Sequence, residues 1–398
     1  MSKKVAILTG GGEVPGLNIC LKRLVTQIID DGFEPYGVRK GWEGLINYNP
    51  EHPASFENYF VELTDTLVRP IDRSAGSFLH SSRIDPQQVS SLVVPQFLRE
   101  EAQDTYDLTD HIKHVIKQLD FSALIVIGDD DMLSHAAHLS EQGIPIIAIP
   151  KTVHNNIYGT EYTIGFTTAL ARSVAFIHEL SALAASREQI VVIETFGVDS
   201  GISSLMTAFL AGVDRAIIPE VPYDPGKLAH LLLRDKRDNP NNYAVMTISN
   251  GATMETDKVE RYLPHLSPQS QATCLFPEDT HYQTESVGDA NSLISSGMVV
   301  AELLQHLLRQ EVFLQPLTYL LRTGLPDGQD LIGATNFALL AARLLKEGDF
   351  GRMTAYQGAQ DLTDIDLSLM KNHIKTVDVE KMYNIETYQP KVDLISMM

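Results

Sequence analysis

The chain has 398 residues, 44% of them hydrophobic, which is enough to bury a sizeable core and long enough for two domains. Its 31 Lys and Arg against 51 Asp and Glu give a formal net charge of −20, so we expect no nucleic-acid or membrane partner. The same charge opposes a small phosphorylated ligand. A phosphate site would therefore have to concentrate Lys, Arg and backbone N–H groups locally.

Two cysteines, Cys20 and Cys274, lie in unrelated contexts and predict neither a disulfide framework nor a metal-ligand cluster. The apolar run 5–8 is too short for a signal-peptide core, and no stretch approaches the roughly 18 apolar residues of a membrane-spanning helix. We therefore expect a soluble cytoplasmic protein.

Short β-branched runs alternate with helical patterns along most of the chain, which is typical of parallel strands joined by crossover helices and predicts an α/β protein. In the first part, a helix with a hydrophobic face at Leu21, Leu24, Val25 and Ile28 is expected to stop at Gly32, and another is predicted over about 132–142. The strands predicted there are 5–8, 33–38, 124–127 and 144–149.

In the second part, a long helix is predicted from Thr167 to about Ser186, followed by elements that would form a second, smaller sheet. The strands predicted there are 190–193, 216–218 and 243–248. The helices predicted there are 203–211, 227–234, 299–307 and 331–345. Residues 252–288 are polar and irregular, which fits a functional lid, a peripheral insertion or a partly disordered segment.

Polar motifs follow three of the predicted strands, where parallel sheets bind their ligands. They are the turn Gly10-Gly11-Gly12, the acidic run Gly128-Asp129-Asp130-Asp131, and Pro150-Lys151-Thr152-Val153-His154-Asn155-Asn156. A glycine turn between strand and helix lets backbone N–H groups approach a phosphate, although such a turn can also be purely structural. The acidic run can likewise cap the helix at Met132 without any ligand.

The last two motifs resemble the paired active-site signatures of the 6-phosphofructokinase family, Gly-Gly-Asp-(Gly or Asp) and Pro-(Gly or Lys)-Thr-Ile-Asp-Asn-Asp. The likeness spans roughly residues 5 to 350. Further motifs in family order are Thr9–Asn18, Gly41–Leu45, Ala75–Arg83, Gly159–Ala169, Pro219-Glu220 and Arg322–Gly324.

The resemblance implies two doubly wound Rossmann-like domains with the active site in the cleft between them. Residues 1–165 with about 322–375 would form a larger domain that binds pyrophosphate or nucleotide. Residues from about 166 to 321 with the C-terminal tail would form a smaller domain of the sugar-phosphate type, with 252–288 as its insertion.

By the same resemblance, the activity would be Mg²⁺-dependent transfer of a phosphoryl group to a sugar phosphate such as fructose 6-phosphate, a step of glycolysis. The donor-binding positions are Gly11, Gly12, Arg83, Asp130, Asp131 and Lys151, with Asp130 as the metal ligand. Pyrophosphate users in the family have Asp and Lys at the positions of Asp131 and Lys151, because a carboxylate repels a nucleotide α-phosphate and an ammonium holds a bare pyrophosphate end. Both markers indicate pyrophosphate. Asp129 departs from the family's Gly and can obstruct the phosphate path.

The catalytic positions implied by the resemblance are Lys151, Thr152 and His154, and His154 replaces the family's catalytic Asp. Histidine can accept a proton near neutral pH but tends to become cationic beside phosphates. Asn156 replaces a second Asp, and its amide oxygen is a poorer magnesium ligand than a carboxylate.

On the acceptor side, three substitutions weaken the family pattern. Val198 replaces an Arg, Gln189 replaces an Arg that acts across subunits, and Asn250 replaces a sugar-binding Glu. The acceptor-binding positions implied by the resemblance are Asn155, Phe196, Gly197, Asn250 and Arg322.

These substitutions leave three hypotheses open. The chain is an active pyrophosphate-type phosphotransferase whose activity is weakened or altered, a degenerate subunit that binds phosphorylated ligands or regulates an active partner, or a transferase for an acceptor without the 6-phosphate. The resemblance also implies a homodimer or homotetramer, with a hetero-oligomer containing an active paralogue as the alternative.

Overall fold

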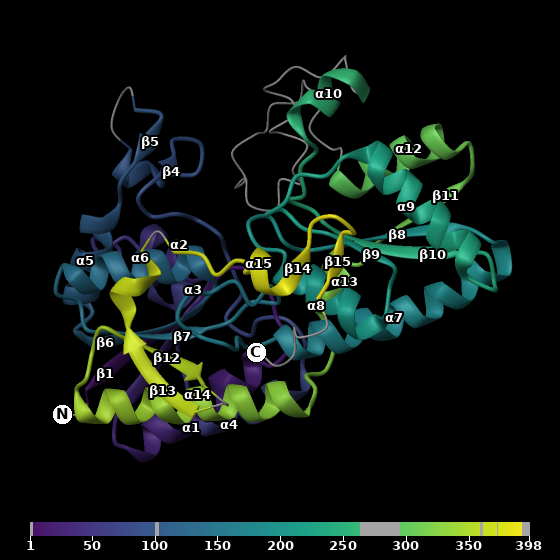
Figure 1. Ribbon diagram of the computed structural model, residues 1–398. Helices are drawn as coiled ribbons and strands as arrows, with labels where there is room; N and C mark the ends of the chain where they lie inside the picture. The colour runs from purple at the N-terminus through teal and green to yellow at the C-terminus, as the bar shows by residue number, and fades with distance from the viewer. Residues whose placement is uncertain (1–2, 100–102, 263–294, 359–360, 372, 392–398) are drawn as a thin grey trace. The chain divides into compact units, whose positions relative to one another are not determined.

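The structure is a computed structural model that describes residues 3–99, 103–262, 295–358, 361–371 and 373–391 (Figure 1). It divides into two compact units, each built on its own sheet. Unit 1 comprises residues 1–168 and 322–374, and unit 2 comprises residues 169–321 and 375–398. The chain therefore passes from one unit to the other after residues 168, 321 and 374.

Unit 1 contains a seven-stranded sheet in the order β13-β12-β7-β6-β1-β2-β3. Neighbouring strands from β12 to β2 pair in parallel, and the edge strands β13 and β3 pair antiparallel to their neighbours. The strands are β1 Lys4–Thr9, β2 Glu34–Val38, β3 Phe60–Glu62, β6 Phe121–Gly128, β7 Ile146–Pro150, β12 Arg352–Gln357 and β13 Asp361–Asp366. A separate two-stranded ribbon is formed by β4 Val89–Ser90 and β5 Thr105–Tyr106.

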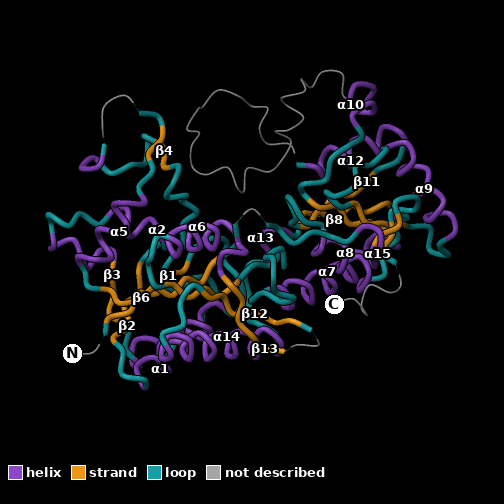
Figure 2. The backbone as a smooth tube through the Cα atoms, turned by 60° about the vertical axis from the view of Figure 1, so that its left-hand side comes forward, coloured by secondary structure: helices purple, strands orange, loops and turns teal. Residues whose placement is uncertain are grey.

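Helices cover both faces of this sheet, which is why its central strands are apolar throughout. Figure 2 shows α1 Leu17–Asp30 and α14 Gly328–Glu347 along one face, and α2 Trp42–Asn47, α5 Thr109–Gln118 and α6 Asp130–Glu141 on the other. Residues 5–8 of β1 are all fully buried, as expected of a parallel strand between two helical layers. The shorter helices of unit 1 are α3 Phe56–Tyr59 and α4 Asp65–Val68.

Unit 2 contains a four-stranded parallel sheet in the order β11-β8-β10-β9. The strands are β8 Ile190–Thr195, β9 Arg215–Ile217, β10 Ala244–Ser249 and β11 Val312–Pro316. One face carries α9 Pro225–Asp238 and α12 Ser296–Leu308, and the other carries α7 Phe166–Arg187 and α8 Ile202–Ala211 (Figure 1). The remaining elements are α10 Thr256–Tyr262, α13 Thr318–Leu321, α15 Val379–Met382 and the ribbon of β14 Tyr383–Asn384 and β15 Gln389–Pro390.

Most predicted elements are present within a few residues, and the predicted second sheet is confirmed with β11 as a further strand. The prediction of an irregular segment over 252–288 is wrong for Thr256–Tyr262, which forms α10. Residues 263–288, including Cys274, lie outside the described residues, whereas Cys20 is buried as a free thiol. Within the described chain, no helix is both long and apolar enough to cross a membrane.

Candidate functional site

Three of the predicted motifs lie together at one edge of the unit 1 sheet. Strands β1, β6 and β7 are neighbours and run parallel, so their carboxyl ends meet at this edge. The glycine turn follows β1, the acidic run follows β6, and the Lys151 motif follows β7. The edge therefore combines backbone N–H groups, carboxylates and cations within a few residues of each strand end.

The glycine turn is held in place by hydrogen bonds on two sides. Gly10 N donates to Ile127 O at 3.2 Å, and Gly11 N donates to Ser82 O at 3.1 Å. The Ser81 hydroxyl donates back to the Gly11 carbonyl. Gly11 has φ +76°, a left-handed conformation that favours glycine. Because residues 81–82 are bonded to the turn, the next residue, Arg83, is brought to the same place.

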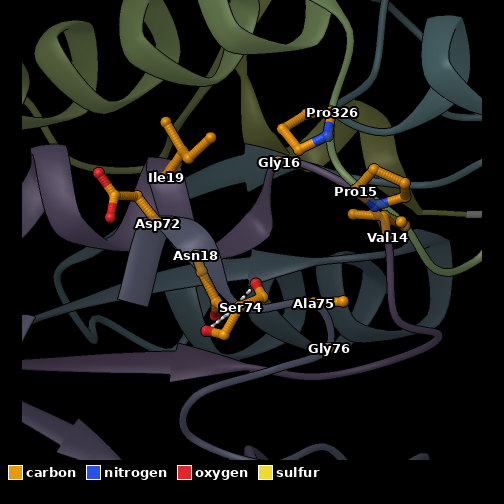
Figure 3. A pocket seen from close by; sticks show the side chains of 11 residues that line it. Val14, Pro15, Gly16, Asn18, Ile19, Asp72, Ser74, Ala75, Gly76 and Pro326 are labelled. Carbon is orange, nitrogen blue, oxygen red and sulfur yellow. Dashed lines mark hydrogen bonds between the residues drawn. The ribbon is translucent and has the colours of Figure 1, made fainter. Parts of the chain in front are cut away.

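Asn18, the last residue of the Thr9–Asn18 motif, connects the region of the glycine turn to a neighbouring loop. Its side chain is buried and donates to Ser74 O at 3.0 Å and to Ser74 Oγ at 3.2 Å, and it accepts from Phe78 N at 2.9 Å. Figure 3 shows Asn18 and Ser74 pointing toward each other in a small pocket beside Pro15 and Gly76. Asn18 thus ties the start of α1 to the loop that leads to Arg83. This structural role of Asn18 was not predicted from the motif.

Lys151 is the most deeply buried cation of the site. Its side chain is 1% exposed, and Nζ donates to Gly12 O at 2.5 Å. Burial lowers the pKa of Lys151 to about 8, while the nearby Asp129 carboxylate acts in the opposite direction. The ammonium therefore remains largely charged at neutral pH. Its hydrogen bond places this charge against the backbone of the glycine turn.

Arg322 also reaches the turn. A Cβ built on Gly12 would coincide with the Arg322 guanidinium, so the guanidinium packs directly on the glycine. The charges of Arg322 and Arg83 both act on Lys151 and on His154. Arg322, which the resemblance places among the acceptor-binding residues, thus belongs to unit 1 and packs on its glycine turn.

The loop after Lys151 is shaped by Thr152 and Asn155. His154 N donates to Thr152 Oγ1 at 3.1 Å, and Asn155 Nδ2 donates to Glu161 O at 2.9 Å. Asn155 is fully buried with φ 53°, a left-handed conformation that asparagine tolerates better than most residues. Asn155, predicted to bind the acceptor, uses its amide N–H to fix the loop.

His154 is a neutral imidazole in this setting. Burial, reinforced by the charges of Arg322 and Arg83, lowers the pKa of His154 to about 3. A neutral ring at pH 7 has a nitrogen that can accept a proton, but the low pKa makes it a weak base. An anion bound beside the two arginines would offset their charge and raise this basicity.

The three acids after β6 have different environments. Asp129 is the N-cap of α6: its Oδ1 accepts from Met132 N at 3.4 Å, and its Oδ2 accepts from Gly12 N at 3.1 Å. Asp130 Oδ2 accepts from Asn156 Nδ2 at 3.1 Å, and Asp131 lies exposed in the first helical turn. The capping alternative thus describes Asp129, whereas Asp130 faces the residue that replaces the family's second Asp.

Asp130 and Asn156 are the residues at this edge that could hold magnesium. In the described ranges, no group of three or more His, Cys, Asp or Glu side chains is arranged to hold a metal ion. Mg²⁺ is often held by only one or two carboxylates together with substrate phosphates and water. Asn156 Oδ1 is buried and has no hydrogen-bond partner among the described residues, and its amide lies against Asp130. Asp130 and Asn156 therefore fit an ion whose coordination is completed by a phosphorylated donor.

Unit 2 places its predicted residues at the corresponding edge of its own sheet. Strands β8 and β10 pair with Thr195 beside Ser249, so Phe196 and Gly197 follow one strand and Asn250 follows the other. Asn250 is 1% exposed, and within the described part of the chain neither of its amide atoms has a hydrogen-bond partner. This side chain can therefore still bind a polar group.

The two expected guanidiniums of unit 2 are replaced by uncharged groups with different surroundings. Val198 is half-buried, and a Cβ on Gly251 would coincide with its carbonyl, so the two loops approach closely. Gln189 is half-buried, and its Nε2 donates to Glu311 Oε2 at 2.7 Å. Neither residue supplies a positive charge for a phosphate.

Asp330 is a structural residue that the sequence analysis missed. Its fully buried carboxylate accepts from Tyr162 OH at 2.5 Å, Gly165 N at 2.9 Å, and both N and Oγ1 of Thr168 at 2.9 and 2.5 Å. Burial raises its pKa, and these hydrogen bonds oppose the rise. The missed signal was periodicity, because Asp330 shares a helical stripe with the buried residues Gly333, Ala334, Phe337, Ala338 and Ala341.

Comparison with known proteins now identifies the family. The phosphofructokinase family model matches residues 4–345. The chain belongs to the phosphofructokinase family. It is 30% identical, over 98% of its length and 99% of the relative's, to a pyrophosphate–fructose 6-phosphate 1-phosphotransferase of Dictyoglomus thermophilum. It is also 27% identical, over 96% of its length and 99% of the relative's, to an ATP-dependent 6-phosphofructokinase of Streptomyces coelicolor.

Solved structures agree on the fold of this family member. A pyrophosphate-dependent phosphofructokinase from Marinobacter aquaeolei superposes with a TM-score of 0.74, covering 99% of this chain and 91% of that one at 16% identity. One from Nitrosospira multiformis gives the same TM-score, covering 98% of this chain and 89% of that one at 15% identity. The predicted phosphofructokinase fold is confirmed. Relatives of both donor types match, so the donor must be argued from the residues of this chain.

Proposed function

We propose that this member of the phosphofructokinase family transfers a phosphoryl group from pyrophosphate to a sugar phosphate such as fructose 6-phosphate, at a rate lowered by His154, Asn156 and Val198. The observation that carries the proposal is the buried Lys151 ammonium on the Gly12 carbonyl, beside the Arg322 guanidinium. A chain of net charge −20 concentrates these cations at a glycine turn, a backbone feature suited to a phosphate.

The donor choice rests on Lys151 and Asp131. An ammonium behind the turn favours a compact anion with a high charge density, and the exposed Asp131 carboxylate repels the longer triphosphate of a nucleotide. Magnesium, held by Asp130 and Asn156, would neutralise part of the phosphate charge.

In the transfer itself, the sugar hydroxyl gives its proton to the neutral ring of His154 and its oxygen attacks the nearer phosphorus of pyrophosphate. The bridging P–O bond breaks and inorganic phosphate leaves. Lys151, Arg83 and Arg322 stabilise the charge on the transferred and departing groups. Thr152 fixes the His154 backbone, which sets the position of the ring.

On the acceptor side, we assign Asn250, Phe196 and Gly197 of unit 2 to the sugar, and Asn155 stays a predicted acceptor-binding residue. The unpartnered amide of Asn250 supports hydrogen bonding to sugar hydroxyls. We further propose that the active form is a homodimer or homotetramer, which sedimentation velocity would test.

A steady-state assay in both directions tests the proposed function. With Mg²⁺, turnover is expected with pyrophosphate and fructose 6-phosphate, and at least about tenfold lower kcat/KM is expected with ATP, a difference of about 1.4 kcal/mol. Equal or better use of ATP would contradict the donor assignment, and absence of turnover with both would contradict the activity.

A second candidate is a degenerate subunit that binds phosphorylated ligands without turning them over. The low pKa of His154 and the use of the Asn156 amide as a donor to Asp130 favour it. Restoring the family's residues at three positions distinguishes the weakened enzyme from the degenerate subunit. If His154→Asp, Asn156→Asp and Val198→Arg together create robust activity in a chain that had none, the degenerate reading is supported. A wild type that is already active contradicts it.

A further inference from the structure

We propose that the Asp129 carboxylate acts as an internal substitute for the donor phosphate: it occupies the anion position of the Gly11–Gly12 turn and must leave before a donor binds. The inference rests on the proposed function in one respect, that this turn receives the donor phosphate. It adds an autoinhibitory contact within the donor site.

The Asp129 carboxylate is in direct contact with the glycine turn. Gly12 N, the N–H group that would serve an incoming phosphate, donates to Asp129 Oδ2 at 3.1 Å. A Cβ built on Gly11 would coincide with the carboxylate carbon and both of its oxygens, so the carboxylate lies directly on the Gly11 Cα. The space and the N–H donor that a glycine turn offers to an anion are therefore already taken by an anionic side chain.

The surrounding charges match an anion at this position. Lys151 Nζ lies behind the turn on Gly12 O, and the Arg322 guanidinium packs on Gly12. The Asp129 charge acts favourably on the Lys151 ammonium and so offsets part of the cost of burying it. A donor phosphate entering beside an unmoved Asp129 would meet a like charge, so donor affinity in the wild type includes the cost of displacing the carboxylate.

Helix capping alone does not require a carboxylate here. The bond from Met132 N to Asp129 Oδ1 is long, at 3.4 Å, whereas the bond from the glycine turn is shorter. Serine and asparagine cap helices about as well as aspartate. Asp129→Ser therefore keeps a capping oxygen on α6 while it removes the charge and empties the turn.

Asp224 provides a matched control. It is the N-cap of α9 in unit 2, where its Oδ1 accepts from Gly226 N at 2.7 Å and Lys227 N at 3.1 Å. Asp224→Ser removes the same charge and leaves the same capping hydroxyl on a helix of similar length. General effects of net charge on anion binding therefore appear equally in both variants.

The experiment is calorimetric titration of the full-length wild type, Asp129→Ser and Asp224→Ser with pyrophosphate, with and without Mg²⁺. The expected result is at least tenfold tighter binding to Asp129→Ser and unchanged binding to Asp224→Ser. Asp129→Asn, which caps without charge, is expected to behave like Asp129→Ser and guards against a folding defect in either variant. Circular dichroism melts of all four proteins verify folding.

The outcomes separate the inference from the proposed function. If wild type and both Asp129 variants bind pyrophosphate equally well, the inference is overturned and the donor assignment stands. If Asp129→Ser binds and the wild type does not, the inference is supported and a wild-type pyrophosphate enzyme is contradicted. If none of the folded variants binds, both are overturned.

Discussion

In both units the predicted site residues follow the carboxyl ends of parallel strands, but the two sets of residues differ in charge. In unit 1, charged residues that follow β6 and β7 contact the glycine turn that follows β1: Asp129 accepts from Gly12 N and Lys151 donates to Gly12 O. In unit 2, residues 195–201 and 249–255 contain no Lys or Arg, and the buried amide of Asn250 has no partner among the described residues. Unit 1 therefore has the cations that our proposal assigns to a phosphate, whereas these two loops of unit 2 contain hydrogen-bonding groups but no Lys or Arg.

This difference in charge between the two sheet edges determines where we expect substitutions to have large effects. Hydrogen bonds to a neutral hydroxyl and charge-assisted bonds to a phosphate differ about twofold in strength, and a bidentate guanidinium adds geometric selectivity. We therefore expect strong effects from substitutions that remove charge in unit 1 and smaller gains from substitutions that restore it in unit 2.

The largest effect is expected from Lys151→Met. The variant keeps an unbranched side chain of nearly the same length but removes the only charge on Gly12 O that the described contacts show, so the proposed pyrophosphate site loses its buried cation. We expect kcat/KM for pyrophosphate to fall about 10³-fold. Lys371→Met, which removes a surface ion pair with Glu141 in the same unit, is the control. A Lys151→Met variant as active as this control would remove the basis of the donor assignment.

Next in size is the loss of stability expected from Asp330→Asn. The amide offers a single acceptor oxygen in place of a carboxylate that receives four hydrogen bonds, and its NH₂ group would face buried donors. We expect the free energy of unfolding to fall by about 3 kcal/mol. Urea denaturation measures it, with the exposed Asp349→Asn as the control. Equal stability of the two variants would show that unit 1 does not depend on this network.

A smaller effect on stability is expected from pH, through the protonation of His135. This residue is 4% exposed, and its ring lies edge-on to the Trp42 ring with 4.9 Å between the ring centroids. Neither ring nitrogen has a hydrogen-bond partner in the described chain. Burial, with a smaller contribution from His138, lowers the pKa of His135 to about 4, against which the Asp107 carboxylate acts weakly. The unfolded chain therefore takes up the proton first as pH falls through about 6.5, and stability is lost until the folded ring also titrates near pH 4.

Between pH 7 and pH 5, this residue should cost about 2 kcal/mol of stability. Urea midpoints of the wild type and His135→Leu across this range measure the effect. The variant should lose that much less stability than the wild type. Parallel pH profiles for the two proteins would show that His135 is protonated equally in the folded and unfolded states.

The smallest effect is expected from Val198→Arg in unit 2. A guanidinium at this half-buried position should pair with a phosphate on the acceptor and lower its KM about tenfold, or about 1.4 kcal/mol, without changing the KM for pyrophosphate. Val198→Gln, which adds length without charge, is the control. If the glutamine variant has the same effect, or if neither changes KM, the missing charge is not what limits acceptor binding.

The sequence predicted the elements that carry their own pattern. Strands β6 and β7 are apolar runs that must be buried whatever surrounds them, and α6 follows β6 with an acid at its N-cap. Strand β13 was missed because it is an edge strand with Asp364 and Asp366 in its pattern, and it exists through its pairing with β12.

The sequence predicted which residues gather at the candidate site, but it did not predict how they contact one another. The strand ends and motifs grouped Lys151, Asp130 and the glycine turn correctly at one edge of a sheet. That Arg322 packs on Gly12 and that Asp129 turns toward Gly11 depends on how separate loops pack together, which local pattern does not encode. Asn155 was predicted from its motif to bind the acceptor, and the structure shows in addition that its amide fixes its own loop.

The most direct test of the account is a single-turnover reaction followed by ³¹P NMR, with enzyme in excess over pyrophosphate and with fructose 6-phosphate and Mg²⁺ present. Excess enzyme reveals transfer even when His154 makes it slow. We predict that pyrophosphate disappears with the formation of equal amounts of inorganic phosphate and a sugar bisphosphate, and that Lys151→Met abolishes the reaction. Pyrophosphate that remains intact beside folded wild-type enzyme would contradict the proposed phosphoryl transfer.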